Sequence, residues 1–345
     1  MSDINTPKKR KRINLYAHRE SKASMSQNQP ISSVLVINNS REEIEPALAS
    51  IKDNFQISYA VREEEIAPAL EKAQPQAIFS MSQSTFPGSA QRIAIDFPTV
   101  RWFHVSGSGY EYILPWDQKR VTVTNGHGVL APFLAEMALG AILMLNCNFL
   151  SYGKQQRRKH WERLFFKPLA GQTLLIVGLG AIGALVAEKA KSQGMRVIAT
   201  RRTPQLHPQV DKVYGDDKLS ELLGEADFVS LHVRLSEATK HLFNADMLAR
   251  MKSGSFLINT SRGPVVDEAA LFEALANKHL AGAYLDVFET EPLPQTSPLW
   301  DMPNVIVTPH ASDNVNDWTH RCTAVFVENL LRWNRGATLR NLVHP

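Results

Sequence analysis

Short apolar runs of strand length alternate with amphipathic segments along the first third of the chain. Apolar residues at helical spacing separate these runs. The pattern predicts strands at residues 34–37, 57–61, 77–79, 102–105 and 121–123, with helices at 41–52, 63–72 and 89–97. Because consecutive parallel strands need a crossover that is usually a helix, this alternation predicts a parallel sheet covered on both faces.

A second alternating series runs from residue 173 to about residue 308. It predicts strands at 173–177, 196–200, 256–259, 281–285 and 305–308, with a helix at 184–193. Residues 130–161, rich in Ala, Leu and Met, predict one long helix before this series, and residues 317–333 predict a final amphipathic helix. We therefore predict an α/β protein of two units, one formed by residues 31–129 with 316–345 and the other by residues 130–315.

Composition argues for a globular protein and against a membrane-spanning, secreted or disulfide-bonded one. The chain has 345 residues, of which 44% are hydrophobic, enough for two ordinary cores. Its longest strongly apolar stretch, residues 137–145, is too short to span a bilayer, and the N-terminus lacks the apolar segment of a secretory signal. Two cysteines indicate no disulfide framework. We expect a cytoplasmic protein without a membrane partner.

The basic character of the chain is confined to its beginning. Residues 1–24 carry a net charge of +5, so the remainder of this +4 chain carries −1. A run of like charge without apolar periodicity is typical of a solvated tail, so we predict a disordered basic head at residues 1–30 and no nucleic-acid partner. The run at residues 8–12 leaves open a nuclear address or a phosphate-binding arm.

A glycine-rich turn follows the apolar run 173–177 directly. In the G-x-G-x-x-G pattern, Gly178 makes the tight turn, Gly180 lets a pyrophosphate approach the backbone, and Gly183 lets helix and strand pack closely. The helix that follows directs unpaired N–H groups at the phosphates. We therefore predict that residues 130–315 form a Rossmann dinucleotide-binding domain. Its predicted coenzyme contacts in this turn are Gly178, Leu179, Gly180, Ala181, Ile182 and Gly183.

The end of the next predicted strand bears on which coenzyme binds. A fold specific for NAD usually has an acidic residue here, about 20 residues past the glycines, to bind the ribose 2′-hydroxyl. This chain has Arg201, followed by Arg202 and Thr203. Two guanidiniums and a hydroxyl can hold a 2′-phosphate, which a carboxylate would repel. The sequence therefore predicts NADP as the preferred coenzyme, with NAD possible.

Several motifs together resemble one enzyme family. The stretches 259–267 (NTSRGPVVD), 282–293 (GAYLDVFETEPL) and 308–310 (TPH), with 125–128 (NGHG) upstream, are similar to the signatures of the D-isomer-specific 2-hydroxyacid dehydrogenases. The resemblance covers residues 34–343. It implies a flavodoxin-like substrate domain and NADPH-dependent reduction of a small 2-keto acid, such as glyoxylate or hydroxypyruvate, to the D-2-hydroxy acid. It also implies a homodimer built on residues 130–161.

The resemblance assigns roles to individual residues. Arg262 would bind the substrate, His310 would be the general acid and base, and Glu291 would be its acidic partner. A guanidinium fork matches the planar carboxylate and carbonyl of a 2-keto acid, and a protonated imidazole can donate a proton to the reduced oxygen. The family loop 106–109 would add Ser108 and Gly109 to the substrate site. Further coenzyme contacts would be Val233, Thr260 and Asp286; no Cys/His cluster has metal-ligand spacing, so no metal is predicted.

At some positions the sequence departs from the family pattern. Tyr110 and Glu111 replace a small residue and Asp, Arg234 replaces a common proline, and Ala311-Ser312 replaces Ile-Gly. We expect the changes at 110–111 and 311–312 to affect substrate identity rather than reaction class. Two alternative functions remain open at this point. One is a nucleotide-sensing transcriptional corepressor, and the other is a formate or phosphite dehydrogenase.

Overall fold

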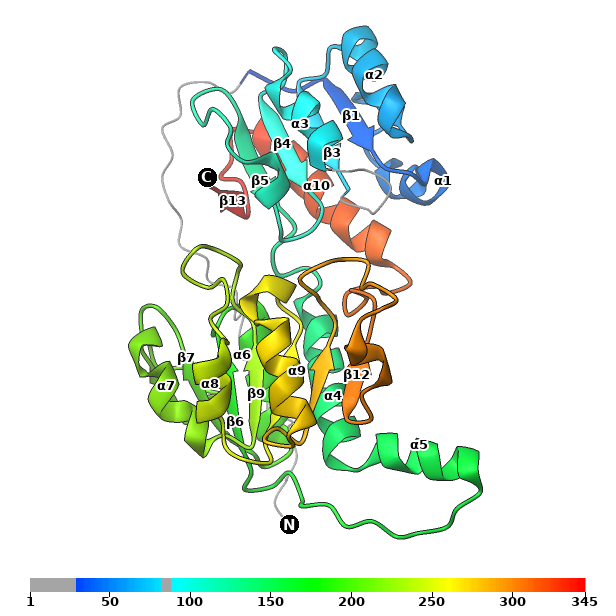
Figure 1. Cartoon of the computed structure of the whole chain (residues 1–345). Helices are drawn as coiled ribbons and strands as arrows, with labels where there is room; N and C mark the ends of the chain where they lie inside the picture. Colours follow the sequence, from blue (N-terminus) through cyan, green and yellow to red (C-terminus); the bar gives the residue numbers. More distant parts are fainter. Residues whose placement is uncertain (1–28, 82–87, 345) are drawn as a thin grey trace, which may run out of the picture.

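The computed structural model describes residues 29–81 and 88–344, and these form two α/β units, one above the other in Figure 1. The predicted basic head, residues 1–30, lies outside the described residues except for residues 29 and 30. Each unit is built around one sheet with helices on both faces (Figure 1).

The first sheet has six strands in the order β13-β5-β4-β3-β1-β2. Strands β1 to β5 are parallel, and their order 2-1-3-4-5 is that of flavodoxin-like folds. The short β13 is antiparallel to β5, so the C-terminal residues complete this sheet. The strands are β1 (Ser33–Ile37), β2 (Gln56–Ala60), β3 (Ala77–Ser80), β4 (Trp102–Val105), β5 (Thr122–Asn125) and β13 (Leu342–Val343). The helices are α1 (Arg41–Ile44), α2 (Ile66–Ala73), α3 (Gly88–Asp96) and α10 (Trp318–Asn334).

The second sheet has seven parallel strands in the order β12-β11-β10-β9-β6-β7-β8. Counted from β6, this is the dinucleotide-binding order 3-2-1-4-5-6 with one more strand, so the predicted Rossmann fold is confirmed. The strands are β6 (Thr173–Val177), β7 (Arg196–Thr200), β8 (Lys212–Tyr214), β9 (Phe228–Leu231), β10 (Phe256–Asn259), β11 (Gly282–Leu285) and β12 (Val305–Val307). The helices are α4 (Ala131–Asn146), α5 (Phe149–Arg158), α6 (Ala181–Ser192), α7 (Leu219–Leu222), α8 (Ala245–Arg250) and α9 (Glu268–Ala276).

The register of the second sheet determines which residues can share a site. The last residues of six neighbouring strands are paired in one row, from Thr200 of β7 to Val307 of β12. The residues that follow these strands therefore meet at one edge of the sheet, which is the edge where open α/β sheets bind ligands. In spatial order they are Arg201, Gly178, His232, Thr260, Asp286 and Thr308.

Two predicted helices are wrong in extent. The segment 41–52 is not one helix: α1 ends at Ile44, and a 3-10 turn begins at Pro46, which has no N–H to continue the α-helical ladder. The segment 130–161 is divided into α4 and α5, which are bent by 59° because Asn148 takes a left-handed conformation with φ 61°. No single described helix is long and apolar enough to cross a membrane, whereas the bent pair α4 and α5 passes that test by length and composition alone.

Smaller deviations concern element ends and three missed strands, β8, β9 and β13. The predicted helix 63–72 begins with a 3-10 turn at Glu63–Glu65, and the predicted helix 184–193 begins three residues earlier, as α6. The edge strand β8 has only three residues, of which the first, Lys212, is exposed, so it lacks the apolar run that predicts a strand. The division into residues 31–129 with 316–345 and 130–315 stays a prediction.

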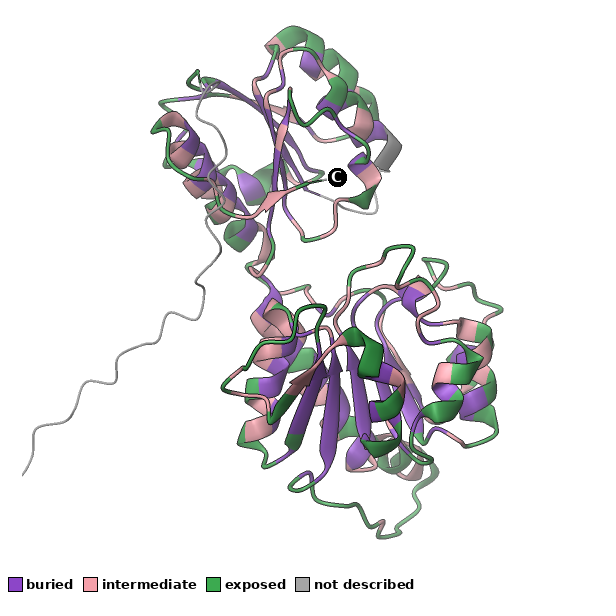
Figure 2. Ribbon diagram, turned by 90° about the vertical axis from the view of Figure 1, so that its left-hand side faces the viewer, coloured by how far each residue is buried: buried purple, intermediate pink, exposed green. Residues whose placement is uncertain are grey.

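Both sheets are buried between their helices, as the purple strands and green outer helix faces in Figure 2 show. The C-terminal helix α10 packs on the first sheet although it follows the whole second sheet in the sequence. Its Phe326 stacks on Phe79 at 4.5 Å and on Trp102 at 5.1 Å between ring centroids. The chain therefore crosses between the two units twice, once before α4 and once before α10.

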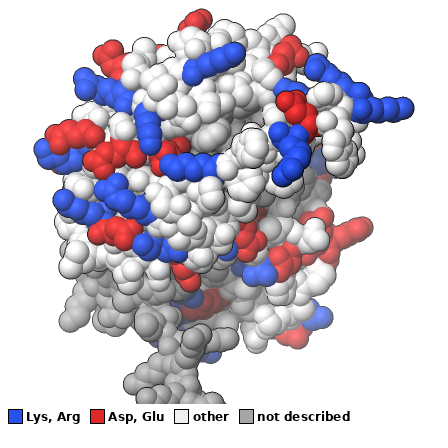
Figure 3. All heavy atoms as spheres, turned by 90° about the horizontal axis from the view of Figure 1, so that it is seen from below, with Lys and Arg blue, Asp and Glu red and all other residues white. Residues whose placement is uncertain are grey.

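Charged residues of both signs are interspersed on the face that Figure 3 shows. Several opposite charges are paired, including Lys191 with Asp211 at 2.8 Å and Arg196 with Glu225 at 3.0 Å. Exposed pairs of this kind contribute little to stability, about 0–1 kcal/mol each. Such a mixed surface agrees with the near-neutral charge of the chain after its first 24 residues.

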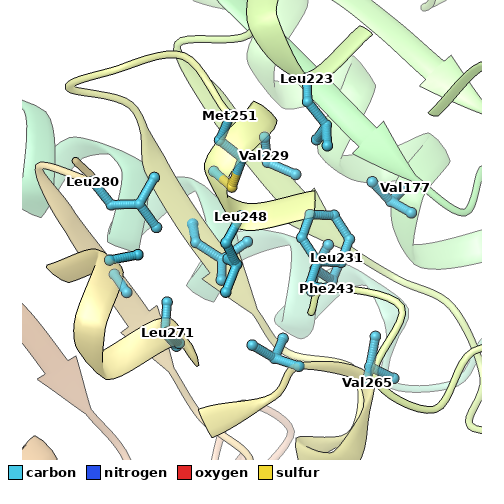
Figure 4. Close-up of a cluster of buried hydrophobic side chains, with 14 of the residues drawn as sticks. Val177, Leu223, Val229, Leu231, Phe243, Leu248, Met251, Val265, Leu271 and Leu280 are labelled. Atoms are coloured by element: carbon cyan, nitrogen blue, oxygen red, sulfur yellow. The ribbon is translucent and has the colours of Figure 1, made fainter. Parts of the chain in front are cut away.

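The core under α8 and α9 consists of apolar side chains from both helices and from the sheet (Figure 4). Phe243 and Leu248 lie against Val229 and Leu231 there, and all four are buried. Burial of each large side chain contributes about 1.5–3 kcal/mol. This core holds β9 and β10 in place, and the site residues follow directly at the ends of these strands.

Candidate active site

The glycine-rich turn after β6 needs glycine at two of its three positions. Gly178 has φ +97°, and a Cβ there would lie 2.8 Å from the carbonyl oxygen of His232. A Cβ on Gly183 would lie 2.9 Å from Cγ2 of Ile176, so a side chain would push α6 away from β6. The expected tight turn and close helix packing are thus explained by sterics at Gly178 and Gly183.

The third glycine faces open space. Gly180 precedes α6, and a Cβ built on it meets no atom within 4 Å among the described residues. The first turn of α6 has N–H groups without helical partners, a ready site for an anion. A cavity of about 540 Å³ reaches this helix end at Ala181, between Pro132 of α4 and Val325 of α10. Of the residues in this turn, Ala181 lines the cavity, and Gly180 leaves open space before α6.

Arg201, Arg202 and Thr203 follow β7 at the other side of this turn, and all three are exposed. The backbone N–H of Arg201 donates to the carbonyl of Tyr214 at 3.0 Å, which fixes the start of the segment. Burial, and then the charge of Arg201, lower the pKa of His207. Within the described part of the chain, neither guanidinium has a carboxylate at ion-pair distance. Both charges are therefore available to an anionic ligand.

Val233 and Thr260 line the neighbouring strand ends. Cγ1 of Val233 lies 2.9 Å from a Cβ built on Gly178, so this side chain packs on the turn. The hydroxyl of Thr260 is buried and has no hydrogen-bond partner among the described residues. An unsatisfied buried hydroxyl is uncommon, and this one can still form a hydrogen bond with a ligand. The unpartnered Thr260 hydroxyl and the open face at Gly180 lie at the same edge of the sheet.

Asp286 organises the segment that follows β12. Its buried carboxylate accepts hydrogen bonds from the Thr308 hydroxyl at 2.6 Å and from the backbone N–H groups of Ala311 at 2.9 Å and Ser312 at 3.1 Å. The N–H of His310 donates to the Asp286 carbonyl at 2.8 Å. These bonds hold His310 at φ 51°, a left-handed conformation that costs about 1–3 kcal/mol for a residue with a side chain.

His310 and Glu291 form a hydrogen-bonded pair. Nδ1 of His310 lies 2.8 Å from Oε2 of Glu291, while Oε1 of Glu291 accepts the N–H of Phe288 at 3.0 Å. The bond to Glu291 raises the pKa of His310 above its ordinary value, against burial and the charge of Arg262. The bond directs the other ring nitrogen, Nε2, away from the carboxylate. His310 is thus an oriented imidazole that remains protonated to a higher pH than a free histidine.

Glu291 is held in its charged form. Burial by itself raises the pKa of Glu291, but the hydrogen bonds from His310 and the Phe288 amide outweigh it. The charges of His310 and Arg262 act in the same direction, so the net pKa is below its ordinary value. Each partner therefore favours the charged form of the other, the carboxylate of Glu291 and the imidazolium of His310.

Arg262 lies between the two sheets. Its Nη1 donates to the carbonyl of Ser261 at 2.7 Å, and a Cβ on Gly109 would collide with its Nη2. The guanidinium therefore rests directly on the loop after β4, and its charge acts on both His310 and Glu291. In the same loop, the carbonyl of Ser108 accepts a hydrogen bond from Nδ2 of Asn125 at 2.8 Å. The structure brings Arg262, Glu291, His310 and the 106–109 loop together.

Two residues near His310, Asp313 and Tyr284, were not predicted from the sequence as part of the site. Asp313 lies in the same turn, and burial raises its pKa, with the charge of His310 acting against this. The hydroxyl of Tyr284 lies 2.9 Å from the hydroxyl of Ser312 and 2.9 Å from that of Thr308. Ser312, where the sequence departs from the family pattern, is therefore in contact with Tyr284 of β11. Only the spacing of Asp313, three residues after His310, could have indicated its place in the site.

Comparison with known proteins agrees with this geometry. Residues 139–312 match the family model of the D-isomer specific 2-hydroxyacid dehydrogenase NAD-binding domain. A glyoxylate reductase of Korarchaeum cryptofilum is 37% identical over 260 residues, which is 72% of this chain and 77% of that protein. The chain belongs to the D-isomer-specific 2-hydroxyacid dehydrogenase family. It is therefore an NAD(P)-dependent oxidoreductase that acts on 2-keto and 2-hydroxy acids.

Two further relatives support the assignment of this dehydrogenase. A glyoxylate/hydroxypyruvate reductase B of Escherichia fergusonii is 36% identical over 237 residues, covering 66% of this chain and 72% of that protein. A D-isomer specific 2-hydroxyacid dehydrogenase from Xanthobacter autotrophicus Py2, solved with NADPH and MES, has a TM-score of 0.77 and 29% identity. That likeness covers 91% of this chain and 98% of the other. Among the described residues of the dehydrogenase, no group of His, Cys, Asp and Glu could hold a metal ion.

Proposed function

We propose that this dehydrogenase reduces glyoxylate or hydroxypyruvate to the D-2-hydroxy acid with NADPH, and that His310 is the general acid. The observation that carries the proposal is the His310–Glu291 pair at 2.8 Å, next to Arg262 and the 106–109 loop. This arrangement places a proton donor beside a group that binds a carboxylate. Reduction of a 2-keto acid needs both a proton donor for the carbonyl oxygen and a group that binds the carboxylate.

Each residue has a chemical task in this proposal. Arg262 binds the substrate carboxylate and carbonyl through its fixed fork, and the backbone of Ser108 and Gly109 binds the other side of the carboxylate. A coenzyme bound at the glycine-rich turn would supply the hydride for the carbonyl carbon. His310 donates its proton from Nε2 to the oxygen, where negative charge develops. Glu291 keeps the imidazole oriented and charged before that transfer.

The substrate is proposed from the names of the relatives. The two curated relatives described above are named for glyoxylate and hydroxypyruvate. The test is a panel of glyoxylate, hydroxypyruvate, pyruvate, phenylpyruvate and formate with each coenzyme, followed by absorbance of the reduced nicotinamide. We expect the highest kcat/KM with glyoxylate or hydroxypyruvate. A preference for phenylpyruvate, or oxidation of formate, would contradict the proposal.

The coenzyme preference rests on Arg201, Arg202 and Thr203. We expect kcat/KM to be about 10–100-fold higher with NADPH than with NADH, because charge-assisted hydrogen bonds to a phosphate contribute about 1.5–3 kcal/mol each and exposure reduces this. Arg201→Asp should abolish or reverse the preference, since it removes an attraction and adds a repulsion. Steady-state kinetics with both coenzymes at fixed ionic strength measure the effect.

Arg196→Asp is the matched control for that experiment. Arg196 lies at the beginning of β7 and pairs with Glu225, whereas Arg201 lies at its end. The control should leave the ratio of kcat/KM with NADPH to kcat/KM with NADH unchanged. Equal use of NADH and NADPH by the unaltered enzyme would show that Arg201 and Arg202 bind no phosphate.

We also propose a homodimer built on α4, α5 and the segment that follows. Large apolar side chains are exposed along this part of the chain, and Figure 1 shows α5 and the following segment extending from the second sheet. Exposed apolar patches of this kind mark association sites. The side chains are Met137, Met144, Phe149, Tyr152, Trp161, Phe165 and Phe166.

Light scattering after size exclusion tests the dimer. We expect twice the mass of one chain for the unaltered protein and a shift toward one chain for Phe149→Asp, because a buried carboxylate without a partner is costly. Ile93→Asp, at an exposed apolar residue of α3, should leave the mass unchanged. A single-chain mass for the unaltered protein would disprove the dimer. A cytoplasmic location and the absence of a nucleic-acid partner stay predictions.

A further inference from the structure

Two departures from the family pattern, Tyr110 and Arg234, lie on different units of the molecule and meet. Tyr110 follows the loop 106–109 of the first sheet, and Arg234 lies three residues past the end of β9 in the second sheet. Nη1 of Arg234 donates a hydrogen bond to the Tyr110 hydroxyl at 3.2 Å. The sequence singled out each residue separately, whereas the structure joins them in one contact between the two units.

Tyr110 is fixed independently of this contact. Its hydroxyl donates to the carbonyl of His344 at 3.2 Å, and its ring packs edge-on against Trp116 with centroids 6.0 Å apart. A hydroxyl has one proton to donate and can still accept a bond, so the bonds to His344 and from Arg234 are compatible. Arg234 therefore binds to a point that the first unit already holds in place.

The backbone of Arg234 is held in place by a turn next to the proposed coenzyme site. Its carbonyl accepts the Thr239 hydroxyl at 2.6 Å, and that hydroxyl also accepts the N–H of Ser236 at 2.8 Å, which closes a tight turn. The preceding residue, Val233, packs on Gly178 of the glycine-rich turn. The Arg234 side chain thus spans from the proposed coenzyme loop to the loop proposed to bind the substrate carboxylate.

We propose that Tyr110 and Arg234 are a positioning pair that sets the separation of these two loops and thereby increases the affinity for the 2-keto acid. The proposal rests on the proposed function of the 106–109 loop and Arg262. Gly109, the neighbour of Tyr110, lies against Nη2 of Arg262, so a displacement of Tyr110 moves one side of the carboxylate site relative to the other. A misplacement of about 1 Å in such a site can cost about 100-fold in rate.

A double-mutant cycle tests the pair. Tyr110→Phe removes only the hydroxyl, and Arg234→Met keeps most of the side-chain stem while removing the donor. We expect each single variant to raise KM for the best keto acid about tenfold and to change kcat and the KM for NADPH less than about threefold, which fits one partly exposed hydrogen bond from a charged donor. The double variant should show no larger effect than either single variant, because both remove the same bond.

Tyr152→Phe is the matched control, because its hydroxyl bonds the carbonyl of Leu164 far from both loops. It should leave KM unchanged. Binding of oxamate, which has the carboxylate and carbonyl of a 2-keto acid but is not reduced, provides a readout without turnover. Its Kd in the presence of NADPH should rise with KM in the two single variants.

The possible outcomes separate this proposal from the proposed function. Effects of Tyr110→Phe and Arg234→Met that multiply in the double variant, or an unchanged KM and oxamate Kd, would overturn the pair while the enzyme still reduces its keto acid. An unaltered enzyme that neither reduces a 2-keto acid nor binds oxamate would instead overturn the proposed function. A tenfold KM effect in Tyr152→Phe would show that loss of any tyrosine hydroxyl has this consequence, and would also overturn the pair.

Discussion

Replacing His310 with alanine should lower kcat for keto-acid reduction by about 100-fold or more, because a positioned general acid contributes about 10²–10⁴-fold. The imidazole is oriented by Glu291 at 2.8 Å and has no role in the glycine-rich turn, so binding of NADPH should be unchanged. Stopped-flow reduction under saturating substrate and coenzyme measures the first effect, and fluorescence titration of NADPH measures the second.

His160→Ala is the control for this variant. His160 is exposed and pairs with Glu162 in the segment after α5, away from the strand ends. It should retain normal kcat. Near-normal turnover by His310→Ala at saturation would show that another group donates the proton, and Asp313 in the same turn would then be the first candidate because burial raises its pKa.

The His310–Glu291 pair predicts how the rates of reduction and oxidation change with pH. The bond to Glu291 raises the pKa of His310, so the proton donor is present below that raised pKa and is lost as the pH rises through it. Reduction should therefore slow in that range, while oxidation of the hydroxy acid, which needs the neutral imidazole, should accelerate. Glu291→Gln removes the largest cause of the shift, so both transitions should move to lower pH. Unchanged pH profiles in this variant would contradict the pairing.

The strand ends explain why much of the site could be predicted from the sequence. Gly178, Arg201, Thr260 and Asp286 each follow directly after a buried apolar run, and parallel strands in register bring such positions to one edge. Local pattern and family motifs were therefore sufficient for the residues of this row. The roles of the individual residues stay predictions until the variants are measured.

What the sequence did not reveal depends on contacts between distant segments. The carboxylate of Asp286 holds Ala311 and Ser312, 25 and 26 residues later, and no local pattern indicates these bonds. Likewise, 124 residues separate Tyr110 from Arg234. The break between α4 and α5 depends on the left-handed backbone of Asn148, which competes with the helical preference of its Leu-rich surroundings. Tertiary contacts decided the first two cases, and a local backbone conformation decided the third.

Arg262→Lys should lower kcat/KM for the best keto acid by about 100-fold or more even though the charge is kept. An ammonium is a point charge, whereas a guanidinium presents two parallel N–H groups to a carboxylate and carbonyl in one plane. Loss of one well-formed charge-assisted hydrogen bond costs about 1.5–3 kcal/mol, and each 1.4 kcal/mol is tenfold in kcat/KM. Steady-state kinetics over a wide range of keto-acid concentration measure the loss.

The geometry of Arg262 makes this substitution informative. Its Nη1 is already engaged with the Ser261 carbonyl at 2.7 Å, and Nη2 rests on Gly109, so the plane of the guanidinium is fixed before substrate arrives. Lysine has no second nitrogen to keep that orientation. Arg196→Lys, at a surface ion pair with Glu225, should change neither kcat nor KM. If Arg262→Lys retained both rate and affinity, a fixed fork would be unnecessary, and the carboxylate would have to bind through the backbone of the 106–109 loop alone.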